Sequence, residues 1–232
     1  VMAILALARD RGDLRRRLGR AVGAYTTAGR PVTADDVGAG GAMAVLMKDA
    51  LAPNLLQTLE GTPALVHAGP FANIAHGSSS ILADVVGLQA ADYVITEAGF
   101  GADVGAEKFC NIKCRISGLH PDAAVVGTPA RAMKGQTGPY RIVPGRPIPD
   151  ALTAENPEEV AAGAENLRRH VAIVRRHGIT PVVAVNHFPT DHPSEHEAIG
   201  TVCRDLGVAW AVCDPHSGGA QHTSGQETAA IG

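Results

Sequence analysis

The sequence has 232 residues, of which 45% are hydrophobic and 19% are charged, and its formal net charge is −3. These proportions are typical of a globular chain with a continuous core and exclude a disordered one. The small negative charge gives no electrostatic drive toward nucleic acid or an anionic membrane, so small solutes or proteins are the expected partners.

The chain carries no sign of a membrane or secretory segment. Its longest apolar runs, such as 64–68 and 208–213, are far shorter than the roughly 20 residues that a membrane-spanning helix needs. The start at 1–9 lacks the basic region of a secretory signal and is interpreted as a truncation within a helix. The cysteines have no paired zinc spacing and are expected to be reduced thiols of a cytoplasmic protein. They are Cys110, Cys114, Cys203 and Cys213.

Residues 1–62 are predicted to form a helical segment. Apolar side chains at helical spacing indicate a helix over 10–25. They are Leu14, Leu18, Val22 and Tyr25. Thr33 and Asp36 resemble a capping box that opens a second helix. The arginines at 15–17 are interpreted as a solvated flank, because no aromatic residues interleave with them to stack on bases.

From residue 63 onward, short β-rich runs alternate with amphipathic stretches. The expected strands are 64–67, 93–96, 123–127, 181–185 and 208–213. The expected helices are 79–91, 157–177 and 194–206. This alternation predicts an α/β fold with a mostly parallel sheet and helices on both faces.

The α/β part divides into three stretches. We predict a βαβ part over 63–135, a surface excursion rich in Gly and Pro over 136–156, and a βα part over 157–232. Loops at the carboxyl ends of parallel strands meet in one crevice, where such sheets bind ligands. The loops that follow the strands are therefore the candidate sites.

The loop after the first expected strand reads GPFANIAHG over 69–77. Gly69 and Gly77 allow backbone conformations closed to other residues, and the helix start that follows offers free amides to an anion. This pattern is typical of a phosphate or carboxylate site. The alternative is an ordinary turn in which Asn73 and His76 bind backbone groups.

Acidic and aromatic side chains follow the other strands. Glu97 and Asp103 could hold a magnesium ion, since hard cations prefer carboxylate oxygen, or could cap a helix. Asn186 could read a base edge and Asp191 could cap the next helix. The phenylalanines lie in or near these loops, either as walls for a flat ligand or as plugs on the sheet. They are Phe71, Phe100, Phe109 and Phe188.

The string His192-Pro193-Ser194-Glu195-His196 matches the H-x-x-E-H motif of inverted zinc peptidases. Because Pro193 favours the first helical position, His192 is expected at the fraying start of the helix and not one full helical turn below His196. A third ligand is found only in the distant Glu227. A zinc hydrolase is therefore the least favoured alternative.

Several longer strings resemble formate–tetrahydrofolate ligases. They are QTLEGTPA at 57–64, GPFANIAHG at 69–77, ADYVITEAGFGADVGAEKF at 91–109, ENLRRH at 165–170 and NHFPTD at 186–191. The resemblance implies a cytoplasmic enzyme, related to P-loop NTPases, that uses ATP and Mg²⁺ to form formyl phosphate. The formyl group then passes to tetrahydrofolate. It also implies a homotetramer, with a monovalent cation as a further candidate cofactor.

The resemblance assigns roles to loop residues by position. Gly69, Phe71, Asn73 and His76 would border the nucleotide and formyl phosphate. Asn186 would lie on the adenine side. These assignments place the phosphate chemistry on the loop for which the spacing alone leaves an anion site and an ordinary turn equally open.

The folate side is assigned in the same way. Phe188 and Pro189 would form one wall of the pterin slot, and His216 would replace the aromatic residue of the opposite wall. Arg131 and Lys134 would face phosphate or the folate tail, although a structural salt link is the alternative.

The sequence contains no G-x-x-x-x-G-K-[ST] string, which this family uses to hold ATP phosphates. We therefore expect the middle portion of a ligase chain, P-loop-NTPase-like but lacking the P-loop and inactive alone. The alternative is a non-catalytic nucleotide- or folate-binding remnant or subunit.

Overall fold

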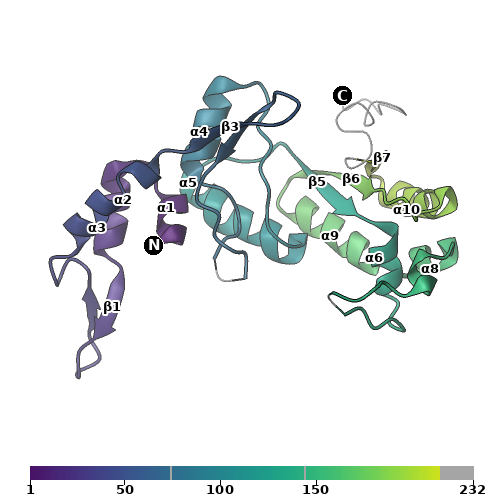
Figure 1. Cartoon of the computed structure of the whole chain (residues 1–232), viewed down its shortest axis with the longest axis horizontal. Helices are drawn as coiled ribbons and strands as arrows, with labels where there is room; N and C mark the ends of the chain where they lie inside the picture. Colours follow the sequence, from purple (N-terminus) through teal and green to yellow (C-terminus); the bar gives the residue numbers. More distant parts are fainter. Residues whose placement is uncertain (74, 144, 215–232) are drawn as a thin grey trace. The chain divides into compact units, whose positions relative to one another are not determined.

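The computed structural model describes residues 1–73, 75–143 and 145–214. The chain forms two compact units, Val1–His120 and Pro121–Gly232, called unit 1 and unit 2 below. Figure 1 shows both, coloured along the sequence. None of the helices in the described ranges is long and apolar enough to cross a membrane.

Unit 1 combines short helices with two small antiparallel sheets. Its elements are α1 (Met2–Leu7), α2 (Arg11–Gly19), β1 (Val22–Tyr25), β2 (Pro31–Thr33), α3 (Gly40–Leu46), η1 (Asp49–Leu51), β3 (Asn54–Gln57), β4 (Pro63–Val66), α4 (Ile81–Ala90), the π-helical η2 (Ala102–Ala106) and η3 (Phe109–Cys114), and α5 (Arg115–Ser117). β1 pairs with β2, and β3 pairs with β4. A small core joins the first helices through Leu5, Ala8, Leu14 and Leu18.

The predicted helix over 10–25 is wrong beyond residue 19. α2 ends at Gly19, where a Cβ atom would lie 2.0 Å from Oδ2 of Asp35. Val22 and Tyr25 fit the helical period but belong to β1, which turns back through Thr26–Arg30 to pair with β2. The cause is a tertiary contact that helical spacing cannot reveal.

The predicted capping box is present, but it does not open a helix. Asp36 Oδ2 accepts from the N–H of Thr33 at 2.7 Å, and Thr33 Oγ1 accepts from the N–H of Asp36 at 3.2 Å. These bonds close a turn after β2, and α3 begins only at Gly40. The same pair of hydrogen bonds therefore stabilises a strand exit.

Two predicted strands of the parallel sheet need correction. The run at 64–67 forms β4, but its partner is the antiparallel β3, in the register Leu55 with Leu65. The run at 93–96 forms no strand. Tyr93 is 89% exposed and Ile95 is 95% exposed, whereas a central strand of a parallel sheet is buried on both faces.

Unit 2 contains the parallel sheet. Its elements are β5 (Ala123–Thr128), α6 (Ala130–Gly135), α7 (Asp150–Thr153), α8 (Pro157–Ala162), α9 (Glu165–Arg176), β6 (Thr180–Asn186), α10 (Pro193–Leu206) and β7 (Ala209–Cys213). The order is β5-β6-β7, with Val183 level with Val126 and Trp210. α9 packs against β5 and β6, and α10 against β6 and β7 (Figure 1).

The α/β class is confirmed, with three parallel strands instead of five. The strands predicted at 123–127, 181–185 and 208–213 and the helix predicted at 194–206 are present within one or two residues. The helix predicted over 157–177 is two helices, which break at Gly163. A Cβ atom there would lie 1.8 Å from the carbonyl oxygen of Met133, so the chain turns where α6 approaches most closely.

Candidate functional sites

In unit 1, residues 68–80 form a tight loop between β4 and α4. Gly77 has φ +66°, and a Cβ atom there would lie 2.3 Å from the Cβ of Ala72, so only glycine fits. At the start of the loop the positive φ falls on Ala68, at 43°, and not on Gly69. The sequence correctly identifies Gly77 as a special position and misplaces the other one.

This loop buries polar groups that have no protein partner. His76 is 1% exposed and Ser78 is 5% exposed. His76 Nε2 and Ser78 Oγ are buried without a hydrogen bond. The same holds for Thr96 Oγ1, which lies in the segment after α4. Buried polar atoms are almost always hydrogen-bonded, so atoms left unpaired in a loop indicate a place for a ligand or a water.

Two lysines shape the electrostatics around His76. Burial lowers the pKa of His76 most, and the charges of Lys113 and Lys108 lower it further. Lys108 Nζ donates to the carbonyl oxygen of Ala72, which fixes the loop. The imidazole is therefore neutral and lies in a positive field, a combination that suits a hydrogen bond to an anion.

Lys113 is itself buried and paired. Its Nζ lies 2.6 Å from Oδ2 of Asp84 and 5.1 Å from the ring centroid of Phe109. Burial raises the pKa of Asp84 and outweighs the opposing hydrogen bond and charge of Lys113. The sequence analysis missed both lysines, because nothing in their spacing marks them and their partners lie far along the chain.

The remaining predicted residues of unit 1 are on its surface. Phe71 is 73% exposed, and Gly69 and Asn73 are exposed in the same loop. Glu97 and Asp103, predicted to bind magnesium, are also exposed. Across the described residues, neither belongs to a group of three potential metal ligands.

In unit 2, the candidate residues lie at the carboxyl ends of β5 and β6. Asn186 ends β6 level with Cys213 of β7, and the His187 N–H donates to the Cys213 carbonyl at 2.9 Å. The Phe188 N–H donates to Asp191 Oδ2 at 3.0 Å, which closes the turn. Asp191, a predicted helix cap, does not occupy the N-cap of α10, which is His192; it closes the loop and also lies 3.3 Å from His196 Nε2 of α10.

Phe188 is half-buried and lies under a guanidinium group. Arg131 Cζ is 3.3 Å from the centroid of the ring, a cation–π contact between α6 and the loop after β6. Pro189 beside it is exposed. Two of the predicted residues, Arg131 and Phe188, are thus brought together at one edge of the sheet, while His216 lies outside the described residues.

Lys134 forms the salt link that was the alternative to a ligand role. Its Nζ lies 2.6 Å from Glu195 Oε1 and 2.8 Å from the carbonyl oxygen of Ala154, and both charged side chains are 1% exposed. Burial opposes ionisation of Glu195, but the bonds from Lys134 and two backbone N–H groups outweigh it and lower its pKa.

The same pair rules out the zinc peptidase interpretation of 192–196. Glu195 would have to act as the base, yet it caps the helix start by accepting from the His192 N–H at 3.1 Å and is bound to Lys134. His192 lies at the N-cap, 3.9 Å from Glu155, and contributes no ligand beside His196. The motif is a helix start and not a peptidase site.

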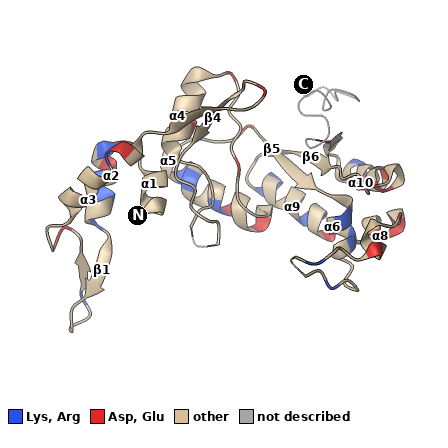
Figure 2. Cartoon of the chain, viewed as in Figure 1, with Lys and Arg blue, Asp and Glu red and all other residues tan. Residues whose placement is uncertain are grey.

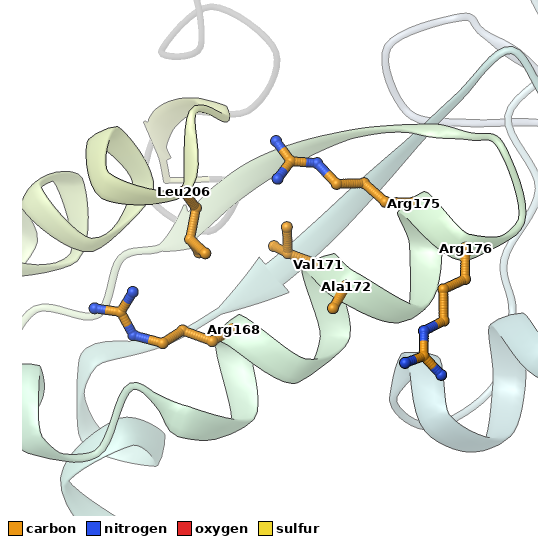
Figure 3. A pocket seen from close by; sticks show the side chains of 6 residues that line it. All are labelled: Arg168, Val171, Ala172, Arg175, Arg176 and Leu206. Atoms are coloured by element: carbon orange, nitrogen blue, oxygen red, sulfur yellow. The ribbon is translucent and has the colours of Figure 1, made fainter.

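A pocket on unit 2 lies at the other edge of the sheet. Figure 3 shows an apolar floor rimmed by arginines. The volume of the pocket is about 310 Å³. It is lined by Arg168, Val171, Ala172, Arg175, Arg176 and Leu206. Five of them are spread along α9 from Arg168 to Arg176, and Leu206 is the last residue of α10. These helices lead to the amino ends of β6 and β7, whereas open α/β sheets bind ligands at the carboxyl ends.

The arginines on α2 are paired with acids. Arg17 Nε lies 2.8 Å from Asp13 Oδ2, and Arg15 Nη1 lies 2.8 Å from Asp35 Oδ1. Figure 2 shows that basic and acidic residues both lie on α2. Burial raises the pKa of Asp13, but hydrogen bonds and charges from Arg17 and Arg9 outweigh it, so the net pKa is lowered. This arrangement is typical of a solvated, charge-compensated helix face.

Comparison with known proteins gives a consistent result along the whole chain. The family model described as formate–tetrahydrofolate ligase matches residues 1–230. The chain is 60% identical to formate–tetrahydrofolate ligase 3 of Rubrobacter xylanophilus over 213 residues, which are 92% of this chain and 37% of that protein. It is 62% identical to the ligase of Roseiflexus castenholzii over 208 residues, 90% of this chain and 37% of the relative. The chain thus spans less than two fifths of the length of these relatives.

Proposed function

Because the chain belongs to the formate–tetrahydrofolate ligase family, we propose that it forms part of an enzyme that joins formate to tetrahydrofolate with ATP. The products are 10-formyltetrahydrofolate, ADP and phosphate. Formate first becomes formyl phosphate, which replaces a hydroxide-like leaving group with phosphate, and the folate amine then takes the formyl group. The proposal includes a cytoplasmic homotetramer and a fold related to P-loop NTPases.

The observation that supports the phosphate side is the pair of buried, unpartnered atoms His76 Nε2 and Ser78 Oγ. Leaving such atoms unpaired costs about 1–3 kcal/mol each, and an anionic oxygen would accept from both. A neutral imidazole with its proton on Nε2 would donate a hydrogen bond to that oxygen, and Lys108 and Lys113 would supply a positive field. These residues fit a formyl or phosphoryl oxygen.

The other nucleotide assignments are part of the same proposal. Phe71 and Asn73 would border the nucleotide from the exposed part of the loop, and Asn186 would contact adenine. Glu97 and Asp103 would bind Mg²⁺, whose charge stabilises the phosphates when it is bound. Phe71, Asn73, Glu97 and Asp103 are exposed and Asn186 is half-buried.

The folate side centres on Phe188. Arg131 covers one face of the ring at 3.3 Å, so a pterin would stack on the other face or take the place of the guanidinium. In the second case the displaced Arg131 would pair with a carboxylate of the folate tail. Pro189 and His216 complete the proposed slot.

The test is a kinetic comparison in a chimera that carries these 232 residues in place of the matching segment of the Rubrobacter xylanophilus ligase. Phe188→Ala should raise the KM for tetrahydrofolate about tenfold, because stacking contributes about 1 kcal/mol or more, and leave the KM for ATP unchanged. Phe100→Ala, an exposed phenylalanine of unit 1, is the matched control. Equal changes in both KM values would remove Phe188 from the folate site.

A further inference from the structure

Three potential metal ligands gather at the carboxyl edge of the sheet in unit 2. They are His187 and Asp191, from the loop after β6, and His196, from the second turn of α10. One ligand atom from each lies within 4.8 Å of the others, and within the described ranges this is the only such group. It shares one histidine with the H-x-x-E-H string but uses neither His192 nor Glu195.

The geometry is close to that of a metal site. His196 Nε2 lies 3.3 Å from Asp191 Oδ2, and the rings of His187 and His196 meet edge to face with centroids 5.3 Å apart. Ligands of a tetrahedral zinc ion, about 2.0–2.1 Å from the metal, lie about 3.3–3.4 Å from one another. One edge already has this length, and the three ligand atoms all lie within 4.8 Å of one another.

A second observation points independently to a ligand. His187 Nδ1 is buried and has no hydrogen-bond partner. A simple hydrogen bond between His196 and Asp191 explains those two side chains, which are 12% and 3% exposed, but leaves the His187 nitrogen unexplained. A metal ion would satisfy all three groups at once.

We propose that His187, Asp191 and His196 bind one divalent transition-metal ion, Zn²⁺ in the first instance, with water in the fourth position. Two imidazoles and one carboxylate suit zinc and its neighbours, whereas Mg²⁺ and Ca²⁺ prefer a full set of oxygen ligands. The ion joins both ends of the 187–191 loop to α10.

The proposed site has a mechanical consequence. Phe188 lies between two of the ligands, so the bound ion holds the loop that carries this ring. The metal binding itself does not depend on the folate assignment, and only its influence on folate rests on the proposed function. Binding measurements made without folate or ATP therefore test the site alone.

The experiment titrates chelator-treated protein with ZnCl₂ in competition with a chromophoric chelator. Wild type should bind one equivalent, and His187→Gln and His196→Gln should each weaken binding by about 100-fold or more, since even the loss of an outer-shell partner costs about 10–100-fold. His192→Gln, four residues before His196, is the matched control and should bind as wild type does. Zn²⁺ should raise the Tm of the wild type and of this control only.

Co²⁺ substitution identifies the donor atoms. The spectrum should show nitrogen and oxygen ligation without a thiolate charge-transfer band, which excludes the four cysteines as ligands. The proposal is overturned if Zn²⁺ does not bind stoichiometrically, if His192→Gln weakens binding as much as His196→Gln, or if thiolate bands appear. Circular dichroism tests whether each variant is folded. If a histidine variant is unfolded, Asp191→Asn replaces it in the zinc titration and should also weaken binding.

Discussion

The two units treat apolar side chains differently. Unit 2 gathers its apolar residues into one cluster that joins α6, α8, α9 and α10 to the sheet, and few large ones remain exposed. Among the described residues of unit 2, the exposed large ones are Val125, Ile142, Ile148 and Val212. Unit 1 has a small cluster and many exposed apolar side chains, including Leu46, Leu55, Leu59 and Tyr93. Contiguous exposed apolar surface is typical of interaction sites in soluble proteins.

Their buried polar groups differ in a parallel way. In unit 2, Lys134 and Glu195 satisfy one another and the backbone. In unit 1, His76 Nε2 and Ser78 Oγ are buried with no partner. A paired interior maintains a fold, whereas an unpaired one is maintained for a ligand. The Lys134–Glu195 pair therefore has a scaffold role. The loop of unit 1 and the His187 Nδ1 atom of unit 2, which are buried without a hydrogen bond, are the places left for ligands.

The largest expected effect comes from breaking the ion pair in unit 2. Lys134→Ala should lower the free energy of unfolding by about 3–5 kcal/mol, because it leaves the charge of Glu195 buried without its partner. Trp210 is the only tryptophan and packs against the core of unit 2, so denaturation followed by its fluorescence reports on this unit.

The control for this prediction is an exposed pair on α10. Arg204→Ala removes the contact with Glu197, where both side chains are more than half exposed, and should cost less than about 1 kcal/mol. Lys134→Met combined with Glu195→Leu should recover much of the loss. Similar costs for Lys134→Ala and Arg204→Ala would show that the buried pair does not stabilise unit 2.

A pair of truncations tests the apolar contrast. Ile199→Ala, at a fully buried position of α10, should cost about 2–5 kcal/mol. Leu56→Ala, at a position 54% exposed in β3, should cost less than about 0.5 kcal/mol. Hydrogen exchange followed by mass spectrometry measures each unit separately. If Leu56→Ala proves as costly as Ile199→Ala, β3 is covered and the contrast between the units fails.

The same contrast explains how much of the fold the sequence predicts. In β6, burial alternates along the strand, so the period of its apolar residues is visible and the prediction is confirmed. In unit 1, β3 has no buried residue and β1 fits a helical period, so periodicity misleads. The ends of α2 and α8 depend on Gly19 and Gly163, whose close neighbours are distant in sequence.

The sequence predicts the loops that carry the candidate sites but not the side chains from other elements that contact them. The positions of His76 and Phe188 follow from strand ends and from family strings. The contacts from Lys113 and Arg131 do not, because each comes from another element at a register that only the folded chain sets. The grouping of His187 with His196 is missed for a further reason, since the H-x-x-E-H string directs attention to His192 instead.

The smallest expected effect is the pH dependence of the loop in unit 1. Burial, then the charges of Lys113 and Lys108, lower the pKa of His76 below that of an unfolded chain, near 6.5. The unfolded state therefore binds more protons in this range, and the stabilisation is complete above the unfolded pKa and lost as pH falls through the folded pKa. Intrinsic amide exchange slows as pH falls, so the quantity to compare is the protection factor. The protection factors at 75–90 should decrease as pH falls from 7.5 to 5.

The variants decide whether His76 is the responsible group. The side chain introduced by His76→Gln cannot gain a proton, so this variant should lose the decrease in protection factors at low pH. His120→Gln, at an exposed position, should retain that decrease. Phosphate or formate should slow exchange in the wild type at pH 7 and have less effect in His76→Gln, because the anion binds the imidazole N–H. If His120→Gln removes the pH dependence instead, the unpaired interior of unit 1 is not what distinguishes it from unit 2.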